Sequence, residues 1–412
     1  MKKVRVGIFG LSRGANYIES FLLCNAEIVA GCDSNEERLK DFSKKVGGTA
    51  ALYTDVEEFM KHDMDAVFLA NYFHQHAVYA ARFLEKGVHV LSECTSNATM
   101  ADGVMLVRAA EKSKAIYMLA ENYPYMVFNQ EMKRVCDGGT LGKILYAEGE
   151  YNHPVAPANA EFARIYRPTL DHWRHFGPRS YYVTHSLAPI MHMTGAIPKK
   201  VNAFAVFDPI DENEPTASAV GDRATVMTTL NNDGSVFKFV GCSAFGAEGN
   251  SYRVCGENGQ IENLRGMGNT VMLRYNPWST PEGKGWGNEY KAEYAPEDKP
   301  LAEKAGHGGS DFFVAREFIR CITENRKPDF DVYFATTMAS VAIMAHRSVL
   351  SGGQAFDIPD LHLEEERKKY ENDRFSPFPD AAEEDRIPCC SHPDYAPTEE
   401  QKQKYLELLK QK

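Results

Sequence analysis

Three residues near the middle of the chain are of types that can move a proton: Glu121, Tyr182 and His185. A histidine titrates near neutral pH and can pass a proton either way, and a carboxylate or a perturbed phenol can accept one. Glu121 follows the apolar run 115–120, where open α/β sheets hold their ligands. Tyr181 stands beside Tyr182, and alternation along an extended strand would direct only one of them inward. We predict a catalytic role for Glu121, Tyr182 and His185, with a packing aromatic and a hydrogen-bonded core histidine as the alternatives for Tyr182 and His185.

A glycine-containing turn follows the first apolar run. Gly10, Ser12 and Ala15 stand at the spacing of the G-x-G-x-x-G/A loop, with Arg13 and Gly14 between them. Backbone N–H groups at the start of the following helix can bind a pyrophosphate, and Ala15 is small enough for the helix to pack on a strand. Ser12 departs from the pattern, because its side chain stands where the backbone should approach the phosphates. We expect Gly10, Ser12, Arg13 and Gly14 to bind a dinucleotide.

Asp33 ends the second apolar run, at about the 20-residue offset from Gly10 that is typical of the carboxylate binding the adenosine ribose diol. Such a carboxylate repels a 2′-phosphate, which predicts NAD as the cofactor in preference to NADP. Arg38 lies about a helical turn further on and would favour the phosphate instead. The alternative for Asp33 is an N-cap of the next helix.

The fold class follows from the order of the apolar runs. Short runs alternate with amphipathic segments in the first part of the chain, which is typical of a parallel sheet covered by crossover helices. The runs are 4–9, 27–32, 66–70, 88–92 and 115–120. Longer β-type runs then follow at 144–151, 201–207, 224–230, 236–244, 252–255 and 271–275. We therefore predict an α/β protein, with an N-terminal Rossmann sheet and a C-terminal α+β domain built on a large, mostly antiparallel sheet.

The bulk properties indicate a globular protein of more than one domain. A chain of 412 residues exceeds what one core usually organises. We predict an NAD-binding Rossmann domain at 1–123, an α+β domain for substrate binding and oligomerisation at 124–360, and a charged, proline-rich tail at 361–412. The tail is expected to wrap the surface or a neighbouring subunit, with a last helix over 398–409.

Charge and cysteine content exclude several classes of function. A net charge of −11 argues against a nucleic-acid partner. The first apolar run is too short for a signal peptide, and no stretch approaches the roughly 20 apolar residues of a membrane span. Nine cysteines, an odd number without a C-x-x-C pair, indicate a reducing compartment. We expect a cytoplasmic protein that does not contact a membrane.

The histidines lack the spacing of a zinc helix motif, so no metal is predicted.

Two segments resemble the Gfo/Idh/MocA family, whose first domain carries A-T-P-x-x-x-H after its fourth strand and E-K-P after its fifth. Here they read ANYFHQH over residues 70–76 and ECT over residues 93–95. The resemblance implies that Asn71, His76 and Glu93 lie around the nicotinamide and its ribose. Cys94 replaces the lysine that many family dehydrogenases place beside the reacting hydroxyl. A thiol is a poor substitute for that lysine, and packing is the favoured interpretation of Cys94.

Four further stretches resemble the NAD-dependent α-N-acetylgalactosaminidase branch of that family, which also lacks the lysine. They are ENY (121–123), WR (173–174), YYVTH (181–185) and HGGSD (307–311), against E-N, W-R, Y-P-T-H-G-L-G-P and H-G-G-M-D in the branch. The resemblance implies the following positions: Glu121 and Asn122 near the nicotinamide ribose, Tyr182 and His185 at the sugar, Trp173 and Arg174 as substrate contacts, and His307 at the pocket rim. The chain departs from the branch at Val183, which replaces proline, and in SLAP over residues 186–189.

The resemblance implies an NAD-dependent carbohydrate-active enzyme that oxidises a ring hydroxyl, at C3, of a sugar or glycoside. In redox-neutral hydrolysis Tyr182 or His185 removes the hydroxyl proton, the ketone acidifies C2–H, the C1 leaving group is eliminated, and the hydride returns after water adds. Two alternatives stay open: a net sugar or glycoside 3-dehydrogenase that releases NADH, and a non-catalytic dinucleotide-sensing protein. The family also implies a homodimer or higher homo-oligomer, formed through the second-domain sheet.

Overall fold

The computed structural model describes residues 3–411, which fold into two compact units. The first unit comprises residues 3–134, 291–339 and 361–371, and the second comprises residues 135–290, 340–360 and 372–411. Helix α10 (Ser310–Glu324) packs on α1 (Ile18–Leu23), and α12 (Glu364–Tyr370) packs on α5 (Met100–Lys112), so segments distant in sequence complete the first unit.

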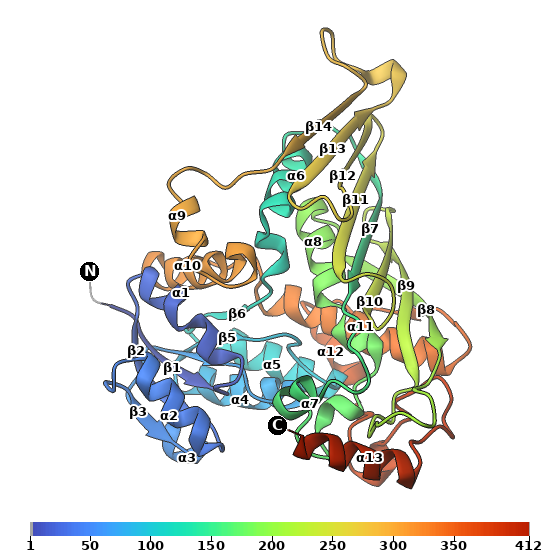
Figure 1. Cartoon of the computed structure of the whole chain (residues 1–412). Helices are drawn as coiled ribbons and strands as arrows, with labels where there is room; N and C mark the ends of the chain where they lie inside the picture. Colours follow the sequence, from blue (N-terminus) through green and yellow to red (C-terminus); the bar gives the residue numbers. More distant parts are fainter. Residues whose placement is uncertain (1–2, 412) are drawn as a thin grey trace. The chain divides into compact units, whose positions relative to one another are not determined.

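The first unit is built on a six-stranded parallel sheet in the order β3-β2-β1-β4-β5-β6 (Figure 1). The strands are β1 Arg5–Phe9, β2 Glu27–Cys32, β3 Ala51–Tyr53, β4 Ala66–Leu69, β5 His89–Ser92 and β6 Tyr117–Leu119. Every residue of β4 is fully buried, as expected of a strand whose two faces are both covered. The strand order reverses between β1 and β4, the place where open α/β sheets bind ligands.

The helices of the first unit follow the strands in alternation. They are η1 Gly14–Tyr17, α1, α2 Glu36–Lys45, α3 Val56–Phe59, η2 Phe73–Gln75, α4 His76–Glu85, α5, η3 Tyr123–Tyr125, α9 Lys299–Ala302, η7 His307–Gly309, α10 and α12. Two more helices, α6 Val127–Asp137 and α11 Val332–Leu350, begin in the first unit and end in the second. Gly87, which follows α4, has φ of +76°, the left-handed conformation that commonly ends a helix.

The second unit is built on a nine-stranded sheet in the order β14-β13-β12-β11-β7-β10-β9-β8-β15. The strands are β7 Ile144–Asn152, β8 Pro198–Phe207, β9 Asp222–Asn231, β10 Val236–Ser243, β11 Gly249–Gly256, β12 Gly259–Asn263, β13 Thr270–Tyr275, β14 Gly287–Lys291 and β15 Phe356–Asp357. The pair β7 and β10 is parallel, whereas β7–β11, β8–β9, β9–β10, β11–β12, β12–β13 and β8–β15 are antiparallel. The predicted fold class is confirmed.

Helices and short 3₁₀ turns connect and cover this sheet. They are α7 Ala160–Tyr166, η4 Trp173–His175, η5 Arg179–Tyr182, α8 Thr184–Thr194, η6 Pro277–Ser279, η8 Glu383–Asp385 and α13 Glu399–Lys410. Helix α8 packs directly on β7, β10 and β11. The close approach requires glycine at position 149, since the carbonyl oxygen of Ser186 lies where a Cβ on Gly149 would stand.

The C-terminal helix α13 begins at the N-cap Thr398 and packs on α7 of its own chain (Figure 1). Ala163 of α7, Ala217, Tyr405 and Leu408 form a small buried cluster there. The expected last helix is present, and it covers the surface of the second unit in the same chain.

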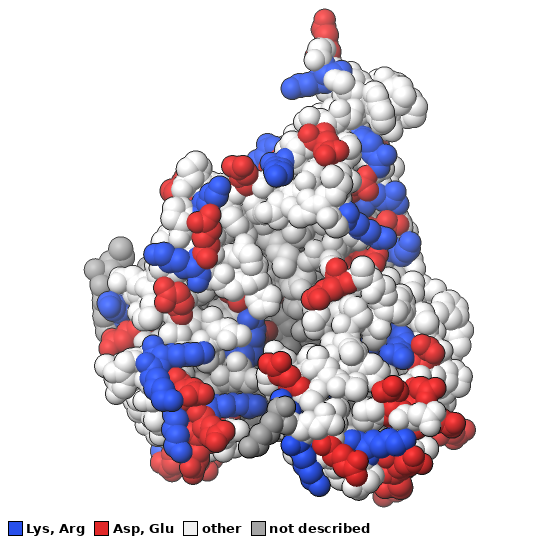
Figure 2. Space-filling model, in the orientation of Figure 1, with Lys and Arg blue, Asp and Glu red and all other residues white. Residues whose placement is uncertain are grey.

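The surface carries both signs of charge. On the face shown in Figure 2, basic and acidic side chains are interspersed rather than gathered into a patch of one sign. Among residues 3–411, none of the helices has the length and apolar character that crossing a membrane requires.

Candidate active site

The glycine turn after β1 is shaped by two glycines with different tasks. Gly10 has φ of +91°, and a Cβ there would stand 2.3 Å from the carbonyl oxygen of Ala70. A Cβ on Gly14 would meet Ile8 Cγ2 at 2.5 Å. Gly14 therefore lets η1 pack on β1, the task that the sequence pattern assigned to Ala15. Ser12, between the two glycines, is exposed.

Asp33 closes the other side of this turn. Its buried carboxylate accepts the N–H of Leu11 at 2.8 Å and the N–H of Asn35 at 2.9 Å, and Arg38 lies 3.7 Å away. Asn35, and not Asp33, caps α2. A carboxylate offers about four acceptor positions, so Asp33 retains acceptor capacity for a ribose diol. The turn and this carboxylate fit the adenosine half of NAD.

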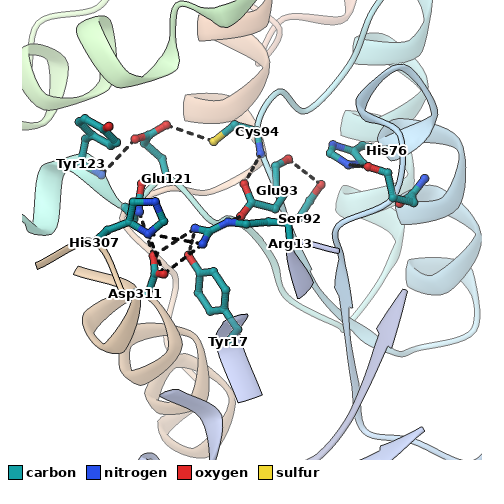
Figure 3. A network of polar contacts seen from close by, with 12 residues as sticks. Arg13, Tyr17, His76, Ser92, Glu93, Cys94, Glu121, Tyr123, His307 and Asp311 are labelled. Carbon is teal, nitrogen blue, oxygen red and sulfur yellow. Dashed lines mark hydrogen bonds and ion pairs between the residues drawn. The ribbon is translucent and has the colours of Figure 1, made fainter. Parts of the chain in front are cut away.

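A guanidinium links the glycine turn to two distant parts of the first unit (Figure 3). Arg13 donates from Nε to Glu93 at 2.7 Å, and its two terminal nitrogens each donate to Asp311 at 3.1 Å. Its charge lies 4.8 Å from the centre of the Tyr17 ring. Arg13 is thus held in a two-pronged ion pair by Asp311, the stronger geometry for a guanidinium and a carboxylate. His307 Nδ1 lies 3.4 Å from Arg13.

Asp311 is the centre of this network. Besides Arg13, it accepts a hydrogen bond from Asn122 Nδ2 at 2.8 Å, and His307 Nδ1 lies 2.9 Å from its other oxygen. Burial opposes ionisation of Asp311, but the hydrogen bond from His307 and the Arg13 guanidinium outweigh burial and hold its pKa well below the usual range. The structure therefore brings Arg13, Asn122 and His307 together, and it places His307 beside the glycine turn.

Glu121 and Cys94 meet at the carboxyl ends of β6 and β5. Cys94 Sγ lies 3.1 Å from one oxygen of Glu121, and the N–H of Tyr123 donates to the other at 3.1 Å. Glu121 is fully buried, whereas Cys94 is half-buried. The residue in the position of the family lysine therefore contacts the predicted catalytic carboxylate directly.

His76 joins two loops at the same edge of the sheet. Its Nδ1 lies 2.9 Å from the carbonyl oxygen of Thr95 and its Nε2 lies 3.2 Å from that of Asn71. Burial lowers its pKa. With both ring nitrogens against backbone oxygens, His76 positions the loops rather than presenting a free nitrogen. The buried Oδ1 of Asn71 has no hydrogen-bond partner among residues 3–411.

In the second unit, Tyr182 and His185 form an aromatic group with Tyr151. The His185 ring meets Tyr182 edge-on at 5.2 Å and Tyr151 edge-on at 5.0 Å, and the two tyrosines stack at 6.1 Å. The hydroxyl of Tyr252 donates to the carbonyl oxygen of His185 at 2.6 Å, which fixes the start of α8. The predicted pair is thus brought together, with Tyr151 as a third member.

Tyr181 and Tyr182 point to different surroundings, although not by strand alternation. They lie in the 3₁₀ helix η5, so the expected extended strand is wrong here. Tyr181 is buried and packs edge-on against His346 and Phe378. Tyr182 is half-buried, which leaves it accessible to a ligand.

Trp173 and Arg174 lie in η4, also in the second unit. The Arg174 guanidinium stacks 4.5 Å from the Trp173 ring centre and 5.7 Å from that of Tyr166. His172 caps this turn by accepting the N–H of Arg174. No set of three or more histidine, cysteine or carboxylate side chains within residues 3–411 is arranged to hold a metal ion.

Two family models match the chain. The oxidoreductase family with an NAD-binding Rossmann fold, Gfo/Idh/MocA, matches residues 4–121, and the C-terminal domain of glycosyl hydrolase 109 matches residues 215–366. The first part of the chain thus resembles the Gfo/Idh/MocA oxidoreductases, and the later part resembles the C-terminal domain of glycosyl hydrolase 109. The resemblance read from the sequence is confirmed, as is an NAD-binding Rossmann domain.

Curated relatives of family 109 match along most of the chain. The glycosyl hydrolase family 109 protein 1 of Bacteroides thetaiotaomicron is 23% identical over 400 residues, covering 88% of this chain and 85% of its own. The alpha-N-acetylgalactosaminidase of Shewanella oneidensis is 22% identical over 396 residues, with the same coverage of 88% and 85%.

Solved structures share the fold. Levoglucosan dehydrogenase in complex with NADH and levoglucosan has a TM-score of 0.73 at 16% identity, and the match covers 87% of this chain and all of that one (100%). An oxidoreductase from Agrobacterium radiobacter in complex with NAD⁺, L-tartaric acid and magnesium has a TM-score of 0.69 at 14% identity, covering 87% of this chain and 99% of that one.

The sequence pattern missed two residues of the candidate site. Asp311 ends the HGGSD motif, four positions after His307 and in the first turn of α10, a position that favours a carboxylate. Tyr151 stands near the end of β7, next to the strand's last residue. Its only signal was its place at the end of a β-type run.

Proposed function

We propose that the protein is an NAD-dependent glycosidase that oxidises a ring hydroxyl of its sugar, at C3, transiently within redox-neutral hydrolysis. One observation carries this proposal: an NAD-binding Rossmann domain and a glycosyl hydrolase 109 C-terminal domain occur in the same chain. The thiol of Cys94 in the position of the dehydrogenase lysine supports it. The alpha-N-acetylgalactosaminidase among the relatives supports a glycoside as the substrate class.

The cofactor residues are assigned from the first unit. Gly10, Ser12 and Arg13 carry the turn that binds the pyrophosphate, and Asp33 binds the adenosine ribose. Asn71, Glu93 and Asn122 lie on loops that follow β4, β5 and β6, the strand ends that face ligands in this fold. Bound NAD⁺ supplies a reversible hydride acceptor.

The proton-transfer residues are assigned from the second unit. Tyr182 Oη or the imidazole of His185 accepts the proton of the sugar hydroxyl, and the two rings lie edge-on at 5.2 Å. Glu121 holds its carboxylate between Cys94 and the Tyr123 N–H and binds the nicotinamide ribose. Trp173 and Arg174 contact the substrate, with the stacked guanidinium as a rigid donor.

We also propose that the chain works in the cytoplasm as a homodimer or higher oligomer. Phe204 and Val206 of β8 and Leu230 of β9 are exposed apolar side chains on the large sheet, which supports a covering partner subunit. The nine free cysteines support a reducing compartment. Light scattering of the purified protein tests the assembly, and a monomer at micromolar concentration would contradict it.

The test of the reaction uses catalytic amounts of NAD⁺ and a panel of 4-nitrophenyl glycosides in D₂O. We expect release of the sugar with deuterium at C2 and no accumulation of NADH. Stoichiometric NADH would instead identify a net 3-dehydrogenase. A protein that binds NAD⁺ in calorimetry yet transforms none of the glycosides would be a dinucleotide sensor, and the absence of any dinucleotide binding would overturn the proposal altogether.

A further inference from the structure

Three arginines of the second unit have no carboxylate partner. Within residues 3–411, Arg167, Arg174 and Arg179 form no ion pair with an aspartate or glutamate. Arg167 stacks 5.3 Å from the Phe162 ring centre, and Arg174 stacks on Trp173. Arg179 donates from Nε to the backbone oxygen of Asp222 at 3.1 Å. We refer to these three side chains as the arginine cluster.

The nearby carboxylates are occupied elsewhere. Both oxygens of Asp222 accept hydrogen bonds from Ser391, one from its N–H at 2.9 Å and one from its hydroxyl. Asp171 is exposed and is paired with Thr169 and its own backbone. The arginine cluster is therefore positive in an otherwise acidic protein of net charge −11.

The three charges act on one another. The pKa of Arg167 is lowered to about 10. Burial is the main cause, and the charges of Arg179 and Arg174 contribute to the same lowering. Burial also lowers the pKa of Arg179. All three guanidiniums also act on the thiol of Cys242. Burial raises the pKa of this thiol, and the three positive charges oppose that rise. Arg167 and Arg174 lie over the rings of Phe162 and Tyr166, whose centres are 4.8 Å apart. Neighbouring like charges repel, so a bound anion would relieve the repulsion.

Unpartnered polar atoms accompany these charges. The Nε of Arg167 is buried without a hydrogen-bond partner, and so are the hydroxyls of Ser180 and Thr184. Ser180 and Thr184 are at most 1% exposed. Buried polar groups in proteins are normally paired, so unpaired donors on the chain segment 167–184, which also carries the three arginines, point to a polar ligand. Ser180 and Thr184 flank Tyr182 in the chain, the proposed sugar-contacting tyrosine.

The segment that carries Arg167 and Arg174 is held by the C-terminal helix. Tyr405 of α13 donates its hydroxyl to the carbonyl oxygen of Arg167 at 2.8 Å and packs edge-on against His175 at 5.2 Å. The backbone of Ala219 donates to the carbonyl oxygen of His175. The cluster is thus fixed by packing rather than carried on a free loop, as recognition of a defined group requires.

We propose that the arginine cluster binds an oxyanion substituent, a carboxylate or a sulfate ester, on the sugar of the substrate. Guanidinium groups bind such oxygens with paired, charge-assisted hydrogen bonds, and the buried hydroxyls of Ser180 and Thr184 supply further donors. The proposal rests on the proposed function, because it names the substrate class of the same sugar-binding unit. The substrate is accordingly an acidic glycoside rather than a neutral one.

The test measures binding by calorimetry to the full chain saturated with NAD⁺. The ligands are galactose, galacturonate and galactose 6-sulfate, with glucose, glucuronate and glucose 6-sulfate as a second series. We expect one acidic member to bind at least about 10-fold more tightly than its neutral parent, with a preference that falls as salt is raised. The carboxylate and sulfate arms identify which oxyanion is recognised.

Arg167→Gln removes one charge of the cluster, and Arg164→Gln, in the last turn of the preceding helix α7, is the matched control. Arg164 donates to the backbone oxygen of Gln411 and lies outside the cluster. We expect Arg167→Gln to abolish the preference for the acidic sugar while binding of the neutral parent changes less than about twofold, and Arg164→Gln to keep the preference. Circular dichroism verifies that both variants are folded.

Two results would overturn the proposal. One is equal affinity of the wild-type holoenzyme for acidic and neutral sugars in both series. The other is loss of NAD⁺ affinity in Arg167→Gln with no change in sugar preference, which would assign the cluster to the cofactor phosphates. Failure of the proposed function is distinguishable: an acidic sugar that binds selectively but acquires no deuterium at C2 refutes the hydrolytic reaction and leaves anion recognition standing.

Discussion

Cys94 Sγ lies 3.1 Å from Glu121 Oε2, so the residue that replaces the family lysine contacts the buried carboxylate directly. A lysine in that position would place a cation beside the carboxylate and beside the reacting hydroxyl. A neutral thiol supplies only a weak hydrogen bond. We therefore propose that Tyr182 or His185, and not Cys94, removes the proton of the sugar hydroxyl.

Glu121 and Cys94 should differ sharply in their effect on turnover. Glu121→Gln is expected to lower kcat by roughly 10²-fold or more, because a buried charge that orients the reacting groups is lost. Cys94→Ala should change kcat by less than about threefold, since the thiol packs against the carboxylate without taking the proton. Steady-state rates with the best glycoside of the panel compare the two. Equal losses in both variants would assign chemistry to the thiol.

The ion pair of Arg13 and Asp311 should contribute strongly to stability. Arg13→Gln leaves the buried carboxylate of Asp311 without its guanidinium, at an expected cost of roughly 3 kcal/mol in the free energy of unfolding. Urea unfolding measures it. Lys61→Gln, which removes an exposed pair with Glu58, is the control and should leave the unfolding midpoint almost unchanged. A midpoint for Arg13→Gln equal to that of wild type would show that the pair is not maintained in solution.

Asp33 should determine the preference for NAD over NADP. Its carboxylate is held by two backbone N–H groups, and Arg38 stands 3.7 Å away. Asp33→Asn removes the charge that repels a 2′-phosphate but keeps the side-chain size, so the ratio of NADP to NAD affinity should rise about 10-fold or more. Fluorescence titration with both reduced cofactors gives the ratio. In the double variant Asp33→Asn/Arg38→Gln, this rise in relative NADP affinity should vanish, because the arginine that would bind the 2′-phosphate is removed.

The sheet was predictable where its strands are buried on both faces. The five apolar runs found in the first domain correspond to β1, β2, β4, β5 and β6, because such strands are continuously apolar. Strand β3, Ala51–Tyr53, was missed since it has three residues that are all partly or fully exposed. Short edge strands give no periodicity to detect.

The candidate site was predictable only where it is local in sequence. Gly10 and Asp33 follow a fixed spacing, and the structure brings both to one turn. Arg13 and Asp311 are 298 positions apart, and no pattern within either segment indicates that they pair. The difference between Tyr181 and Tyr182 depends on a 3₁₀ turn that local sequence does not distinguish from a strand.

Buried histidines should make the protein sensitive to mild acid. Burial lowers the pKa of His346 to about 4, and burial together with Arg167 lowers that of His175 to about 4. Both values lie below the ordinary 6.5, so the unfolded chain binds protons first, and stability falls as the pH drops from about 6.5 toward 4. Asp311 affects stability at a lower pH. Because its pKa is depressed in the folded protein, its contribution to stability is present above pH 3.8, the ordinary pKa of an aspartate, and is lost as the pH falls below that value.

The variant His346→Gln tests whether His346 makes the folded protein less stable as the pH falls. The variant is expected to lose stability at pH 7.5, but its difference from wild type should narrow by roughly 1.4 kcal/mol per pH unit below 6.5, because one buried neutral base is removed. Urea unfolding at pH 7.5, 6 and 5 gives the slope. Parallel curves for the two proteins would mean that His346 takes up its proton in the folded state.

Tyr182 and Tyr181 form a matched pair, because they are adjacent and chemically identical but differ in surroundings. Tyr182 stacks with Tyr151 and meets His185 edge-on, whereas Tyr181 packs in the core against His346 and Phe378. Tyr182→Phe removes the hydroxyl that we propose as an acceptor of the substrate proton, so kcat should fall about 10²-fold while the melting temperature changes little. Tyr181→Phe should leave kcat within about threefold of wild type. Hydrogen–deuterium exchange at C2 of the sugar, followed by NMR with both variants, separates the outcomes: exchange retained in Tyr182→Phe and lost in His185→Asn would transfer the role of base to the imidazole.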